Sequence, residues 1–150
     1  MKNLCVFGLL LLFFQSCTLS ASQEASLNSA KTSFIKSKNE GLVLSYVAFT
    51  LPEVVAFYKN KSDSSFQKRF DLSSVNEEVY LMDGNVKEVV SKGMNIHVKY
   101  DFQNSQSEEN TREMVFALSN NDGKSWYFAE GEDYFNTNII PEGKRLINRE

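Results

Sequence analysis

The side chains that could carry acid–base chemistry gather on one predicted strand, residues 94–102. His97 is the only histidine of the chain, and Asp101 lies on the same face of this strand. At about 3.3 Å per residue the two are roughly 13 Å apart, which is too far for a catalytic dyad. Tyr100 is the only polar side chain on the opposite, aromatic face, where a buried tyrosine is more often structural than catalytic. Tyr100, His97 and Asp101 are the catalytic candidates, but the sequence favours a non-catalytic protein.

A second group of polar side chains follows the last predicted strand. Glu130, Glu132, Asp133 and Tyr134 form an acidic and aromatic patch that could contact a carbohydrate or a peptide. The alternative is an ordinary solvated loop. No phosphate-binding loop, serine-nucleophile motif or metal-spaced carboxylate cluster is present, so we expect no cofactor and no metal site.

Composition excludes several classes of function. The 150 residues fit a single domain, and the formal net charge of -3 argues against nucleic acid, which proteins bind through lysine and arginine. Cys5 and Cys17 are the only cysteines, and both lie in the first 20 residues. If this segment is removed or anchored, the folded part has no thiol for catalysis, zinc binding or an internal disulfide.

The amino terminus has the pattern of an export signal. A start with one positive charge precedes the apolar run Leu4–Phe14, which is too short to span a bilayer but has the length of a signal-peptide core. We therefore assign residues 1–16 to a signal peptide, 17–26 to a polar tether and 27–150 to one folded domain. The chain is expected to be exported and to reside in the bacterial cell envelope, membrane-anchored or periplasmic.

The junction before Cys17 resembles the lipobox of bacterial lipoproteins. Ser16 fits the position before the cysteine, whereas Phe14 and Gln15 depart from the usual residues. The resemblance implies cleavage before Cys17 and attachment of a diacylglycerol to its sulfur, which would make the membrane a partner. Cleavage after Ser20 would instead release a soluble protein without Cys17.

Helical spacing dominates the first half of the folded domain. Residues 24–38 place apolar side chains at helical intervals. A second helix is predicted over residues 51–60, because Thr50 with Glu53 forms a capping box and Pro52 suits the first turn of a helix. Asp63 is expected to cap a further short helix. The stretch 42–49 is apolar nearly all round, and its period does not distinguish a helix from a strand.

Alternating patterns replace helical ones from residue 77 onwards. Residues 77–82 and 86–90 predict a hairpin, followed by strands 94–102 and 111–119. The hairpin 114–130, pivoting on Asp122, is predicted to pair Phe116 with Phe128, and Leu118 with Trp126, on the face that meets the helices. Matching that face across strands 94–102 and 111–119 sets Lys99 opposite Glu113. Helices followed by about five antiparallel strands predict an α+β fold, with the helices packed on a curved sheet.

Two resemblances arise from this order of motifs. Ser119–Trp126 is similar to the sialidase Asp-box, with Asn121 in place of the aspartate, and a single copy indicates a shared hairpin rather than a propeller. More of the chain, residues 27–131, resembles small exported proteins with a nuclear transport factor-like fold. Tyr46, Thr50 and Pro52 before a helix, and the closing Asp-Gly-Lys-Ser-Trp-Tyr-Phe, carry that resemblance. It implies a cone-like sheet wrapped around helices, often with an internal pocket.

Three functions remain open at this point. The first is an exported, lipid-anchored, non-catalytic binding or accessory module for a small molecule or peptide. The second is a small-molecule isomerase or dehydratase with a pocket inside the cone, as some relatives of that fold are. The third is a homodimer or partner-binding protein that uses the outer sheet face at Val115, Ala117, Tyr127 and Ala129.

Overall fold

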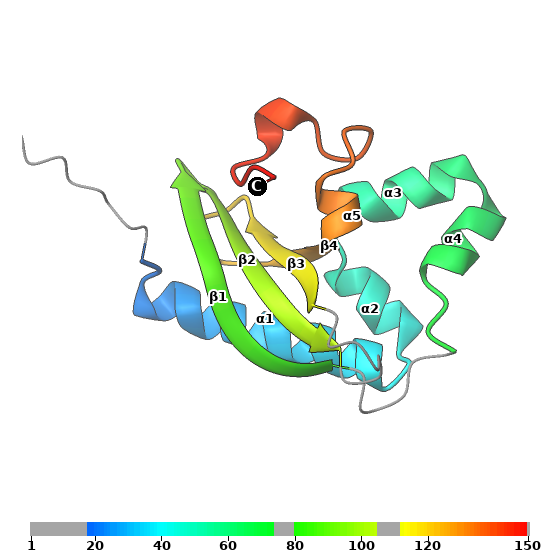
Figure 1. Ribbon diagram of the computed structural model, residues 1–150, viewed down its shortest axis with the longest axis horizontal. Helices are drawn as coiled ribbons and strands as arrows, with labels where there is room; N and C mark the ends of the chain where they lie inside the picture. Colours follow the sequence, from blue (N-terminus) through cyan, green and yellow to red (C-terminus); the bar gives the residue numbers. More distant parts are fainter. Residues whose placement is uncertain (1–17, 74–79, 105–111, 150) are drawn as a thin grey trace, which may run out of the picture.

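The computed structural model describes residues 18–73, 80–104 and 112–149, which form an α+β fold (Figure 1). Four helices precede one antiparallel sheet, whose strand order is β1-β2-β3-β4. The predicted fold class is therefore confirmed, with four strands among the described residues. Cys17 and the predicted signal peptide lie outside the described residues. No helix in the described part of the chain is long and apolar enough to cross a membrane.

Helix α1 spans Ala21–Asn39 and starts earlier than predicted. Ser20 caps it, because its side chain accepts a hydrogen bond from the Gln23 amide while the Gln23 side chain accepts one from the Ser20 amide. The helix therefore includes most of the stretch 17–26 that we expected to be a tether. Gly41, with φ of 67°, ends this segment and turns the chain into α2.

The stretch 42–49 is helical rather than extended: α2 spans Val43–Phe49. Helix α3 spans Pro52–Lys61 and α4 spans Asp63–Arg69. Both predicted caps are wrong in detail. The Thr50 hydroxyl donates to the Tyr46 carbonyl oxygen at 2.8 Å instead of capping α3, and α4 is capped by Ser62, whose hydroxyl oxygen accepts from the Ser65 amide.

The sheet comprises β1 (Tyr80–Lys92), β2 (Asn95–Asn104), β3 (Arg112–Ser119) and β4 (Tyr127–Glu130). The predicted hairpin at residues 83–85 is wrong, since β1 is one long, bent strand. Its pairing with β2 is irregular between Leu81 and Asn85, so the turn residues interrupt the ladder instead of reversing the chain.

The register of the β3–β4 hairpin is one residue away from the prediction. Ala117 lies opposite Phe128 and Phe116 opposite Ala129, so the two phenylalanines are on opposite faces of the sheet. The connection runs over residues 120–126, and side-chain hydrogen bonds organise it. Asn121 Oδ1 accepts from the Ser125 amide at 3.0 Å, and Ser119 Oγ accepts from the Gly123 amide at 2.9 Å.

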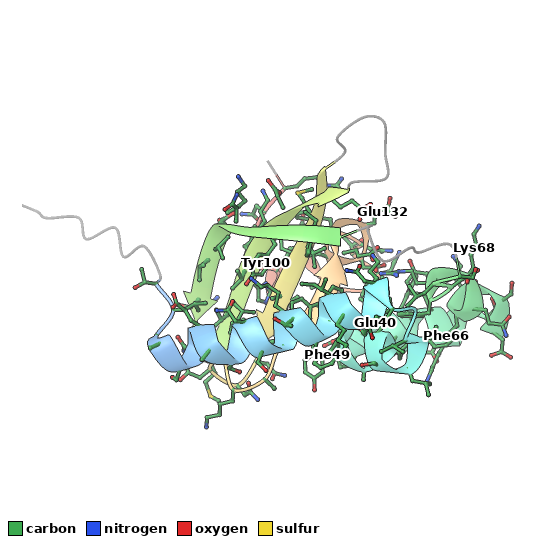
Figure 2. The ribbon with its side chains drawn as sticks, turned by 90° about the horizontal axis from the view of Figure 1, so that it is seen from below. Glu40, Phe49, Phe66, Lys68, Tyr100 and Glu132 are labelled. Atoms are coloured by element: carbon green, nitrogen blue, oxygen red, sulfur yellow. The ribbon has the colours of Figure 1, made fainter. Side chains whose placement is uncertain are left out.

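The face of the sheet that meets α1 contains the larger part of the core. Phe128 stacks on Phe34 of α1 with ring centroids 4.5 Å apart, and Tyr100 lies on the same face, with the Lys31 ammonium 5.4 Å from its ring. Figure 2 shows α1 running across this face. The predicted apolar face of 94–102 is therefore confirmed as the one that meets the helices.

The opposite face of the sheet is covered as well. Helix α5 (Gly131–Tyr134), the 3-10 helix η1 (Glu142–Lys144) and the segment around them lie over it. The ring of Tyr134 stacks on that of Phe116 with centroids 3.8 Å apart, and Ile139 and Ile140 are buried. Val115 and Phe116, which point to opposite faces of β3, are therefore both enclosed.

Two sequence predictions for the sheet are wrong. Val115 and Ala117 lie on the α1 face and are fully buried, and Ala129 is buried on the other, so the proposed dimer surface is not exposed. Lys99 lies opposite Phe116 rather than Glu113. An unbroken apolar run in β3 has no alternation that would identify one outer face.

Candidate functional site

The C-terminal ends of α1 and α4 meet the end of β4 in a cluster of charged side chains. Lys38 Nζ lies 2.7 Å from Glu130 Oε1, and the Tyr46 hydroxyl donates to the same oxygen at 2.8 Å. Arg69 bridges Glu130, at 3.4 Å, and Asp133, to which its Nε donates at 3.0 Å. We call Lys38, Tyr46, Arg69, Glu130 and Asp133 the ionic cluster.

The electrostatics of the ionic cluster suit a structural role. Burial alone would raise the pKa of Glu130, but Lys38 and Arg69 outweigh it and lower that pKa to about 2. Burial, followed by the Glu130 charge, raises the pKa of Tyr46 to about 12. Neither group can exchange protons near neutral pH, and the two cations balance the two carboxylates. The cluster therefore ties helices to the sheet.

The predicted acidic and aromatic patch is divided by this arrangement. Glu130 and Asp133 belong to the ionic cluster, whereas Tyr134 is fully buried against β3. Glu132 is the exposed member, and Figure 2 shows it on the far side of the sheet from α1. The four residues thus do not form one common binding surface.

A hydrogen-bonded pair occupies the sheet face beneath the carboxyl-terminal segment. His97 Nδ1 lies 2.7 Å from the Tyr134 hydroxyl, whose oxygen accepts from the Ile147 amide at 3.1 Å. The Leu146 amide also donates to His97 Nδ1, at 3.4 Å. Nδ1 therefore acts as the acceptor, and the neutral imidazole carries its proton on Nε2.

Burial lowers the pKa of His97 to about 4, so the imidazole is neutral in the folded protein at physiological pH. The pair links β2 to α5 and to the last residues of the chain. His97 also lies in the wall of a cavity formed by the described residues.

This cavity has a volume of about 770 Å³ and opens between the sheet, the start of α3 and the carboxyl-terminal segment. Its apolar walls come from Leu51, Pro52, Leu118, Ile139, Ile140, Pro141 and Leu146. Polar groups around it include Glu53, Lys92, His97, Asn120 and Lys144. We call this space the carboxyl-terminal cavity. Apolar walls with a few polar groups are typical of small-molecule sites.

The structure does not bring the three catalytic candidates together. Tyr100 is buried on the α1 face, where burial raises its pKa. Asp101 lies on the opposite face, 3.8 Å from Lys87 Nζ. His97 alone reaches the carboxyl-terminal cavity.

Sequence reasoning missed the ionic cluster. Arg69 lies in a lysine-containing stretch that is typical of a solvated surface, yet its side chain is only 15% exposed and contacts two carboxylates. Nothing in the local spacing distinguishes Arg69 from its exposed neighbour Lys68, which Figure 2 shows on the outer side of α4. The pairing depends on contacts between segments more than 60 residues apart.

Comparisons with known proteins provide no relative for this chain. No family model, curated protein or solved structure matches it. Within the described ranges, no group of three or more histidine, cysteine, aspartate or glutamate side chains could hold a metal ion. The cavity and its surroundings are therefore the features of the described residues that bear most directly on function.

Proposed function

We propose that this protein is an exported, lipid-anchored, non-catalytic binding module whose ligand occupies the carboxyl-terminal cavity. The volume of about 770 Å³ carries the proposal, because it falls within the usual range for small-molecule sites, roughly 300–1,000 Å³. The N-terminal signal pattern and the Ser16-Cys17 junction support export and lipid attachment. The bent sheet lying against α1 supports a likeness to the cone of nuclear transport factor-like proteins.

The surroundings of His97 favour binding over catalysis. A general base needs a free lone pair within reach of the substrate and a pKa near the working pH. His97 Nδ1 already accepts hydrogen bonds, and burial lowers the pKa of the imidazole to about 4. The carboxylates of Glu130 and Asp133 are held in the ionic cluster. The cavity thus has the polarity of a binding site without a poised acid–base pair.

The lining of the cavity indicates a class of ligand. Leu118, Ile139 and Ile140 offer apolar surface. Among the charged residues around it, the two cations Lys92 and Lys144 outnumber the one carboxylate, Glu53. A small molecule or short peptide with an apolar body and an anionic end would match this distribution.

Fragment binding followed by amide NMR tests the site. Amphipathic carboxylates are expected to shift the amide signals of His97 and Leu118. Gly143 also lines the cavity, and a Cβ at this position would meet no atom within 4 Å. Gly143→Trp should therefore occupy the cavity and abolish the shifts, whereas Gly143→Ala, the matched control, should retain them. Shifts that persist in Gly143→Trp would move the site elsewhere.

Lipid attachment has its own test, which uses the two cysteines as a matched pair. Labelled fatty acid should be incorporated into the wild-type chain and into Cys5→Ser, but not into Cys17→Ser. If the wild-type chain incorporates none, the proposal of a lipid anchor at Cys17 is wrong. That result would leave the cavity proposal intact.

A further inference from the structure

Three consecutive large apolar residues are exposed at the start of α2. Leu42, Val43 and Leu44 are 46%, 38% and 89% exposed, and we call them the Leu42–Leu44 triplet. Single exposed apolar residues are normal on protein surfaces, but three adjacent ones at the tip of a helix mark an interaction site.

Chain geometry limits how far this triplet can lie from the proposed anchor. Cys17 is three residues ahead of Ser20, the cap of α1, and an extended chain covers at most about 3.6 Å per residue. A lipid on Cys17 would hold the start of α1 within roughly 11 Å of its attachment point. With 19 residues at 1.5 Å each, α1 is about 28 Å long and reaches from there to the triplet.

Helices α1 and α2 lie on the same side of the molecule. Viewed from below, both stand in front of the sheet, with Glu40 and Phe49 marking the region of α2 (Figure 2). The exposed positions of α1 are mostly small and neutral: Ala21, Ser22, Ala25, Asn28, Ser29 and Thr32, with Glu24 and Lys36 as the charged exceptions. This side could approach a lipid surface while desolvating few charges.

We propose that the Leu42–Leu44 triplet inserts into the bilayer to which Cys17 is anchored, so that α1 lies along the membrane surface. The inference rests on the lipid anchorage proposed above and adds an orientation to it. The carboxyl-terminal segment covers the other face of the sheet, so the carboxyl-terminal cavity would open away from the membrane (Figure 1). A ligand could then enter from the aqueous side.

A second copy of the chain fits the triplet less well. Stable protein–protein interfaces bury about 800 Å² on each partner, from some 20 residues or more. The triplet is three residues wide and is flanked by the polar residues Glu40 and Ser45. Membrane insertion needs no such area, because a few apolar side chains beside a covalent lipid supply the second attachment signal.

Fluorescence in vesicles tests this orientation on the mature lipoprotein. Since Cys17 would carry the lipid, a new cysteine is the only thiol available for labelling with a nitrobenzoxadiazole dye. We compare Leu44→Cys with Met114→Cys, which replaces another exposed apolar residue, 39% exposed, on the sheet face opposite α1. Vesicles of phosphatidylethanolamine and phosphatidylglycerol carry a nitroxide quencher in the acyl chains.

The label at position 44 should show blue-shifted emission and quenching, and the label at position 114 neither. Equal, unquenched emission at both positions overturns the inference. So does a blue shift at position 44 that grows with the protein-to-lipid ratio without quenching, because this would indicate a second copy. Since the dye is itself apolar, Val43→Cys is also labelled in a Leu42→Ser/Leu44→Ser background. Quenching of the label at position 43 should be lost in this background. Quenching that persists would overturn the inference, because it would show that the lipid anchor alone brings this site to the membrane.

The intact mass of the same preparation separates this inference from the anchorage on which it depends. A mass without lipid on Cys17 overturns both proposals. A lipidated protein whose label at position 44 stays in water overturns the orientation alone and leaves the anchored binding module standing.

Discussion

Replacing Lys38 with methionine tests whether the ionic cluster fastens the helices to the sheet. The Lys38 side chain is 10% exposed and contacts Glu130 at 2.7 Å. Removing one partner of a buried pair costs about 3–5 kcal/mol. Arg69 still contacts Glu130 at 3.4 Å, and the Glu130 side chain is 30% exposed. We therefore expect Lys38→Met to lower the free energy of unfolding by about 2–3 kcal/mol at pH 7.

The same helix supplies a matched control. Lys36 makes an i,i+4 pair with Glu40 at 3.9 Å, and its side chain is 65% exposed. Such surface pairs contribute about 0.3–0.5 kcal/mol, so Lys36→Met should change stability by no more than that. Urea unfolding of both variants can be followed by the fluorescence of Trp126, the only tryptophan, which is buried.

The pH dependence adds a test that general loss of packing would not pass. The pKa of Glu130 is lowered from 4.5 to about 2, so its stabilisation is complete above pH 4.5 and lost as the pH falls through 2. A shift of this size corresponds to at most about 3 kcal/mol. The deficit of Lys38→Met should therefore shrink over this range. The role of the cluster would be refuted if both lysine variants lost the same unfolding free energy, or if the loss in Lys38→Met did not change with pH.

Three further predictions concern other parts of the fold, each measured by urea unfolding. Burial lowers the pKa of His97 from 6.5 to about 4, so stability should fall as the pH drops between these values; a slope that survives His97→Gln would have another source. Gly123 has φ of 76°, and a Cβ at this position would lie 2.6 Å from the Gln23 side chain of α1. Gly123→Ala should therefore lower the free energy of unfolding by more than about 1 kcal/mol. An equal loss for Gly143→Ala, where a Cβ meets no atom within 4 Å, would disprove this. Phe34→Ala should cost about 3–5 kcal/mol and the partly exposed Phe49→Ala less; the reverse order would contradict the assigned core.

Local sequence patterns predicted the helices and strands better than they predicted which residues pair between strands. The strand 94–102 alternates strictly, and its apolar side chains do meet the helices. The α+β class follows from the order of the hydrophobic patterns along the chain, with helical spacing first and strand alternation afterwards. The short stretch 42–49 could not be assigned, because seven helical residues with apolar side chains on most sides have the pattern of either element.

The hairpin after β3 shows why registers were harder to predict. Residues 114–118 are all apolar, so neither alternation nor burial selects which of them face α1. The register is instead fixed by the hydrogen bonds that Ser119 and Asn121 make within the connection. Leu118 lies opposite Tyr127 rather than Trp126, and this shift of one residue places Phe116 on the other face from Phe128, where Tyr134 covers it.

The same coverage explains why the candidate site was found only in part. The alternating pattern of residues 94–102 places His97 on the polar face of the strand, yet the imidazole is buried because the last residues of the chain fold over it. Tyr134 and Leu146 contact the imidazole, and Ile139, Ile140 and Leu146 form one wall of the carboxyl-terminal cavity. A cavity enclosed partly by the end of the chain can adapt to its contents more readily than one enclosed by sheet and helix alone. Ligand binding there should therefore stabilise the carboxyl-terminal segment more than the sheet, because the strands are already held together by their hydrogen-bonded ladder.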